Sequence, residues 1–143
     1  MPDKLRETSR LKKSRRFADL VKIMELLLGG NGCPWDRKQT HNTLLKYLKE
    51  EAGEVALAVR KKDWENLKEE LGDVLLQVVF HSALARKAGR FSIDDVIETI
   101  NAKLVRRHPH VFGGHKLKTP AQVLVEWKRI KKLEKSHKQR IKN

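Results

Sequence analysis

Residues 64–88 carry the feature that most limits how this chain can fold, a long helical pattern with apolar residues around most of its circumference. One stripe at helical spacing consists of Leu67, Leu71, Val74, Leu75 and Val78. Other directions are covered by Leu76, Val79 and Phe80. A helix of this kind must be buried on two sides, and one layer of short helices can cover only part of it. We therefore predict that the outer arc, which includes Leu76, pairs with a second copy in a homodimer, with a tetramer as an alternative.

The remaining segments are also predicted to be helical, because no run shows the alternating apolar pattern and β-branched enrichment of a strand. Glycine, proline and capping residues divide the chain into about five helices, at residues 14–28, 42–60, 64–88, 92–107 and from 119 onward. Asp63 is suited to cap the third helix, Gly89 to follow its end, and Thr119 with Gln122 to form a capping box for the last helix. The sequence predicts an all-α helical bundle.

Length and composition are typical of one soluble domain. With 143 residues, 39% of them hydrophobic, the chain can bury one sizeable core. No stretch reaches the roughly 18 apolar residues of a bilayer span, and residues 1–16 lack the apolar centre of a signal peptide. We therefore expect a cytoplasmic protein with a basic N-terminal tail at 1–16, a single domain at 17–131 and a basic C-terminal helix end at 132–143.

The net charge of +14 is concentrated at the two ends of the chain. Residues 1–16 carry seven Lys or Arg and two acids, and residues 116–143 carry ten and two, which leaves the middle close to neutral. This distribution disfavours specific nucleic-acid binding by the folded body. A helical RNA-binding or regulatory module that uses the basic ends remains an alternative of a different class.

Acidic side chains at helical spacing on two neighbouring helices form the candidate chemical site. They are Glu50, Glu51, Glu54, Glu70 and Asp73. On each helix these acids lie three or four residues apart and share a face, and a short turn makes the two helices antiparallel neighbours. Carboxylates that meet beside an apolar stripe repel one another severely unless a cation is bound. Oxygen ligands favour Mg²⁺ or Mn²⁺ over zinc, and Mg²⁺ implies a phosphate substrate. The alternative is that these acids are solvated, as we expect for Glu65 and Glu69.

Basic and aromatic residues are candidates to hold such a substrate. Lys103, Arg106 and Arg107 occupy one turn, and Lys103 and Arg107 are four residues apart, so both could hold phosphate oxygens. Favourable charge at a helix C-terminus is the alternative explanation. Trp35 and Trp127 could either stack on a base or pack in the core.

These residues, in this order, resemble the MazG family of nucleoside triphosphate pyrophosphohydrolases, from about Phe17 to Lys131. The likeness includes Gly32-Cys33-Pro34-Trp35-Asp36, the E-E-x-x-E at Glu50–Glu54, the E-x-x-D at Glu70–Asp73, and Arg106-Arg107-His108-Pro109-His110-Val111-Phe112. The acidic pattern is shared by a wider all-α superfamily that includes dimeric dUTPases and dCTPases, so a pyrimidine-specific relative is an alternative. The first and last of these stretches are similar to MazG itself.

The resemblance implies a dimerising, magnesium-dependent hydrolase that cleaves a nucleoside triphosphate between the α and β phosphates, as in nucleotide-pool house-cleaning. It implies that the metal ligands are Glu51, Glu54, Glu70 and Asp73, and that Glu50 is an accessory acid near a second metal or near the attacking water. The positions similar to the family's nucleotide contacts are Lys103, Arg107, Trp127 and Lys131. With Arg106 and Trp35, these complete the substrate-binding residues that we predict.

Overall fold

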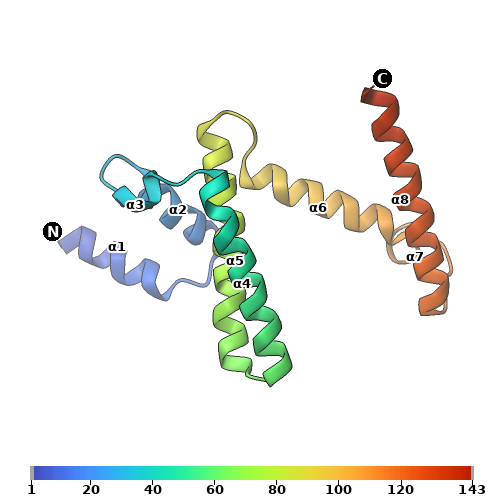
Figure 1. The fold of residues 1–143 in the computed structure, drawn as a ribbon, viewed down its shortest axis with the longest axis horizontal. Helices are drawn as coiled ribbons and strands as arrows, with labels where there is room; N and C mark the ends of the chain where they lie inside the picture. The colour runs from blue at the N-terminus through green and yellow to red at the C-terminus, as the bar shows by residue number, and fades with distance from the viewer. Residues whose placement is uncertain (1, 143) are drawn as a thin grey trace. The chain divides into compact units, whose positions relative to one another are not determined.

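A computed structural model describes residues 2–142, and all of their regular structure is helical (Figure 1). The helices are α1 (Pro2–Lys13), α2 (Phe17–Leu28), α3 (Pro34–Arg37), α4 (His41–Lys61), α5 (Trp64–Lys87), α6 (Ile93–Arg107), α7 (Pro109–Phe112) and α8 (Pro120–Lys142). The all-α prediction is confirmed. The predicted count of about five is wrong, since the described residues form eight helices. The sequence pattern missed α1 and the one-turn helices α3 and α7, which are too short to show a period.

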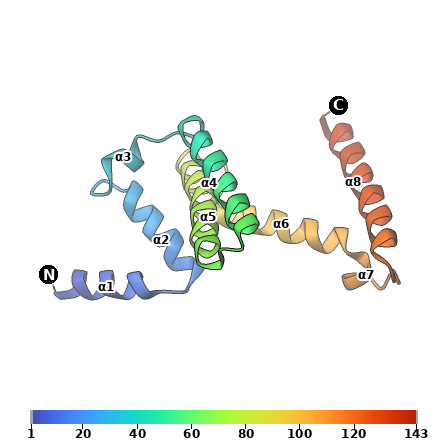
Figure 2. The same cartoon turned by 60° about the horizontal axis from the view of Figure 1, so that its bottom comes forward.

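The chain divides into two compact units, one ending at Ile93 and the other beginning at Asp94. In the first unit, α4 and α5 form a helical hairpin whose helices lie side by side (Figures 1 and 2). Lys62 ends α4 in the left-handed conformation, with φ 55°, and the Asp63 carboxylate accepts a hydrogen bond from Asn66 N at 3.1 Å. The predicted cap at Asp63 is confirmed. Because only these two residues separate the helices, α4 and α5 run antiparallel.

A small apolar core joins α2, α4 and α5. Its buried members are Met24, Leu28, Leu44, Val79 and Phe80. Leu76 packs against this cluster, so its predicted place on an outer arc is wrong. The reason is that the core shared by α2, α4 and α5 lies on the side of α5 that carries Leu76. The stripe of Leu71, Leu75 and Val78 is exposed instead, at 51%, 39% and 39%. We refer to these three residues as the open stripe.

The loop between α2 and α3 turns tightly at Gly32. A Cβ at this position would lie 2.1 Å from the Leu27 carbonyl oxygen, so only glycine fits. The next amide, Cys33 N, donates to the same carbonyl oxygen at 2.8 Å. This turn leads into α3, whose Trp35 meets Tyr47 of α4.

The segment predicted as a basic N-terminal tail contains α1. It is attached to the buried Asp19 of α2, whose carboxylate accepts hydrogen bonds from Ser14 Oγ at 2.5 Å and from Arg10 Nη1 at 3.0 Å. These bonds lower the pKa of Asp19, the one from Ser14 most strongly.

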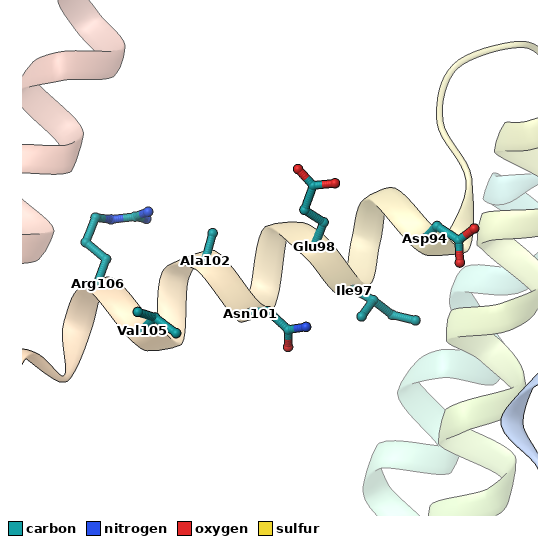
Figure 3. Close-up of a pocket in the computed structure, with 7 residues that line it drawn as sticks. All are labelled: Asp94, Ile97, Glu98, Asn101, Ala102, Val105 and Arg106. Carbon is teal, nitrogen blue, oxygen red and sulfur yellow. The ribbon is translucent and has the colours of Figure 1, made fainter. Parts of the chain in front are cut away.

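The second unit contains α6, α7 and α8. The capping box of α8 is confirmed, because Gln122 N donates to Thr119 Oγ1 at 3.2 Å and Thr119 N donates to Gln122 Oε1 at 3.3 Å. None of the residues of α6 is buried. Figure 3 shows side chains of a shallow groove along α6 pointing to more than one side of the helix, with apolar Ile97 and Val105 38% and 48% exposed.

Within residues 2–142, no helix combines the length and the apolar character that a bilayer span requires.

Candidate metal and nucleotide site

Three carboxylates converge where the acidic faces of α4 and α5 meet. Glu51 comes from α4, and Glu70 and Asp73 come from one turn of α5. One oxygen from each residue lies within 4.8 Å of the others, and all three side chains are half-buried. Glu54 is exposed, yet its charge acts on Glu70. Glu50 is exposed and lies outside this triad.

The electrostatics of Glu70 indicate unbalanced negative charge in the triad. Desolvation, a hydrogen bond with Glu51, and the charges of Glu51, Asp73 and Glu54 together raise the pKa of Glu70 from 4.5 to about 7. A divalent cation would balance this charge, and the oxygen donors fit a hard ion such as Mg²⁺ or Mn²⁺. The residues present therefore fit the metal that the sequence predicts.

An aromatic pair lies one helical turn from the triad. Trp35 is 51% exposed and meets Tyr47 edge to face, with ring centroids 5.8 Å apart and planes at 67°. Lys46 Nζ lies 4.9 Å from the Tyr47 ring centroid. Tyr47 precedes Glu51 by four residues and so shares its face of α4. Sequence reasoning missed Tyr47, although this spacing could have revealed it.

In the second unit, one carboxylate of α8 holds two arginines from the end of α6. Arg107 donates from Nη2 and Nε to Glu134 Oε2, at 2.9 and 3.3 Å, and Arg106 donates from Nε to Glu134 Oε1. The Arg107 and Glu134 side chains are only 15% and 16% exposed. The hydrogen bond from Arg107 is the main cause that lowers the pKa of Glu134 to about 2. Glu134 was also missed, although it shares a helix face with Trp127 and Lys131.

Trp127 lies beside this charged group. The guanidinium carbon of Arg107 is 5.2 Å from the Trp127 ring centroid, and His108 meets the ring edge to face at 5.2 Å. Trp127 also lines a groove of about 550 Å³ with Leu117, Pro120, Val123 and Leu124. In the described part of the chain, Lys103 and Lys131 take no part in an ion pair, so both ammonium groups are free to bind an anion.

The structure thus groups the predicted residues within each unit. The first unit brings Glu51, Glu70 and Asp73 together, with Glu54 nearby. The second brings together Arg106, Arg107 and Trp127.

A sequence profile described as the MazG nucleotide pyrophosphohydrolase domain matches residues 39–112, more than half of the chain. The chain belongs to this family. The matched range covers α4 to α7 and includes all five predicted acids. Trp127, Lys131 and Glu134 lie beyond it.

Relatives and a solved structure agree with this assignment to the MazG family. The nucleoside triphosphate pyrophosphohydrolase/pyrophosphatase MazG of Thermotoga maritima is 53% identical over 122 residues, which are 85% of this chain and 46% of that protein. The nucleoside triphosphate pyrophosphohydrolase of Escherichia coli is 44% identical over 83% of this chain and 46% of its own length. The chain therefore spans less than half of these curated relatives. The crystal structure of a MazG-related protein from Thermotoga maritima superposes with a TM-score of 0.68 at 34% identity, over 80% of this chain and 98% of that one.

Proposed function

We propose that this chain is a magnesium-dependent hydrolase that cleaves nucleoside triphosphates between the α and β phosphates, giving a monophosphate and pyrophosphate. The observation that carries the proposal is the convergence of Glu51, Glu70 and Asp73, with the pKa of Glu70 raised to about 7. Similarity to proteins named nucleoside triphosphate pyrophosphohydrolase supports the choice of substrate. Removal of unwanted nucleotides from the cellular pool is the role that we propose for this activity.

The acidic cluster would hold the metal. The proposed ligands are Glu51, Glu70 and Asp73. Glu54 is proposed as a fourth ligand, because its carboxylate is exposed and its charge acts on Glu70. When bound, Mg²⁺, or Mn²⁺ in its place, supplies positive charge that neutralises the triphosphate. Glu50, exposed and next to Glu51, is proposed to accept a hydrogen bond from the attacking water and orient it toward the α phosphorus.

The basic and aromatic residues would bind the nucleotide. Lys103 and Lys131 are free to pair with phosphate oxygens, and Arg106 and Arg107 add further donors. Trp127, which lines an apolar groove, and Trp35, which is half-exposed, are the proposed stacking partners for the base. In this scheme the protein forms no covalent bond with the substrate, so its residues act through positioning and charge stabilisation.

The proposed working form is a homodimer. The open stripe of α5 leaves Leu71, Leu75 and Val78 exposed, and apolar residues of α6 are exposed as well. Burying the open stripe against a second copy would remove it from water.

A nucleotide panel tests the activity. The chain is incubated with Mg²⁺ and each ribo- and deoxyribonucleoside triphosphate, and the products are separated by anion-exchange chromatography. Monophosphate and pyrophosphate are the expected products. Diphosphate and phosphate would contradict the proposed bond, and hydrolysis of a single pyrimidine nucleotide would favour the dUTPase-like alternative. Absence of hydrolysis, together with tight RNA binding, would favour the binding module.

Glu70→Gln provides the matched variant for the metal assignment, with Glu69→Gln as its control because Glu69 is exposed on the same turn. We expect Glu70→Gln to abolish hydrolysis and Glu69→Gln to leave it unchanged. Full activity of folded Glu70→Gln would contradict the assignment.

A further inference from the structure

We propose that Glu134 is a positioning residue that orients Arg107 and Arg106 toward the triphosphate, an inference that rests on the proposed function. Its carboxylate is the only acid among the described residues that contacts either arginine. Its two oxygens are divided between the arginines, Oε2 to Arg107 and Oε1 to Arg106.

The contact with Arg107 fixes the plane of the guanidinium group. Both Nη2 and Nε donate to one oxygen of Glu134, which leaves Nη1 free to donate elsewhere. The side chains of both partners are at least four-fifths shielded from solvent, so water cannot easily replace the carboxylate. An arginine held in this way has lost most of its rotamer freedom before a ligand arrives, and the entropic cost of binding a phosphate falls accordingly.

The same contact aligns the aromatic residue. Glu134 follows Trp127 by seven residues and Lys131 by three, so all three occupy one face of α8. That face meets the end of α6, where the Arg107 guanidinium carbon lies 5.2 Å from the Trp127 ring centroid. Glu134 therefore sets the distance between the predicted base-stacking residue and the predicted phosphate-binding residue.

The net charge of the basic group shows that Glu134 does not neutralise it. Lys103, Arg106, Arg107 and Lys131 carry four positive charges, and Glu134 supplies one negative charge, so the group stays cationic. Because the pKa of Glu134 is lowered to about 2, the carboxylate remains ionised at every pH at which the protein would act. The contact is a constant feature of the site.

The test compares kcat and KM for Glu134→Gln, Glu134→Asp and Glu126→Gln in the full chain, using the best nucleotide from the panel. Glu126 is the matched control, because it is the other acid of α8 and pairs only with Arg129 among the described residues. Loss of a charge-assisted hydrogen bond predicts that Glu134→Gln raises KM about tenfold or more. Glu134→Asp keeps the charge on a shorter side chain and should raise KM by a smaller factor, while Glu126→Gln should match the wild type.

Two measurements separate positioning from stability. The dissociation constant of a non-hydrolysable triphosphate analogue should rise with KM, and the ¹⁵N signals of the Arg106 and Arg107 Nε–H groups should lose their protection from exchange in Glu134→Gln. If that variant does not fold, Glu134→Asp decides the question by the same measurements. Unchanged KM and signals in a folded variant, or a fall in KM that marks Glu134 as a competitor of phosphate, would overturn the inference. A wild type that neither hydrolyses nor binds nucleotides would overturn the proposed function instead, while the ¹⁵N signals would still report on the Glu134 contact.

Discussion

The Nδ1 atoms of His41 and His81 lie 2.8 Å apart, and the two imidazole rings are stacked with centroids 5.0 Å apart and planes at 12°. His41 begins α4, and His81 lies late in α5, so the contact joins the two helices near the open end of the hairpin, away from the turn. At this separation one ring donates a hydrogen bond to the other, which requires that the pair share a single Nδ1 proton. Burial, and to a smaller extent the charge of His41, lower the pKa of His81.

We predict that acid destabilises the fold through this pair. A histidine with a lowered folded-state pKa binds fewer protons than the unfolded chain, so its contribution is present above the ordinary value of 6.5 and is lost as the pH falls below it. From pH 7 to pH 5 the melting temperature of the wild type should therefore fall relative to that of His81→Phe. The exposed His137→Gln serves as control and should follow the wild type.

The acidic triad predicts the opposite trend in metal-free protein. With its pKa raised to about 7, Glu70 binds a proton in the folded state that the unfolded chain releases near pH 4.5. This contribution is present below pH 4.5 and is lost as the pH rises through about 7. In buffer that contains a chelator, the melting temperature of Glu70→Gln should therefore increase relative to that of the wild type as the pH rises.

At neutral pH, addition of Mg²⁺ should raise the melting temperature of the wild type above that of Glu70→Gln. A ligand that binds only the folded state raises the melting temperature with its concentration. The wild type and Glu69→Gln should both gain stability, whereas Glu70→Gln should gain much less. Equal gains in all three proteins would show that the ion binds elsewhere.

The two faces of α5 predict different outcomes for neighbouring leucines. Leu75 is on the open stripe, so Leu75→Glu should yield a folded monomer in light scattering, with a melting temperature that no longer rises with protein concentration. Leu76 packs against the core, so Leu76→Glu should unfold the protein. A wild-type monomer at micromolar concentration would contradict the proposed dimer.

The turn after α2 predicts a contrast between two glycines. Gly32→Ala would place a Cβ 2.1 Å from a backbone oxygen, so the free energy of unfolding should fall by about 1–3 kcal/mol. At Gly30 no atom lies within 4 Å of an added Cβ, so Gly30→Ala should be neutral or stabilise by up to about 1 kcal/mol. Urea unfolding of both variants measures the difference. A neutral Gly32→Ala would mean that the turn can relax without cost.

Local spacing was enough to predict the α4–α5 hairpin and the N-terminal caps of α5 and α8. Asp63, Thr119 and Gln122 act over three residues, and Glu70 and Asp73 share a turn, so sequence distance alone determines these relationships. The same kind of reasoning placed the acids on facing helices. It could not decide whether all five converge, because that depends on the rotation of each helix against the other.

Contacts between distant segments could not be predicted in this way. Leu76 and Leu75 are equivalent as apolar residues, and only the way α5 packs in the core with α2 and α4 distinguishes them. Glu134 is 27 residues from Arg107, and His41 is 40 residues from His81, so neither pairing leaves a periodic signal in the sequence. The one-turn helices α3 and α7 are likewise fixed by the turns around them.

The left-handed turn at Lys62 has a consequence for how the protein folds. Because this turn joins α4 directly to α5, Glu51 and Asp73 are close in sequence, and bringing them together closes a short loop at small entropic cost. Contacts of low sequence separation form early and fast. The nascent hairpin would therefore meet the repulsion among its carboxylates before most of the apolar core exists. A divalent cation would act on the rate of folding as well as on the finished site.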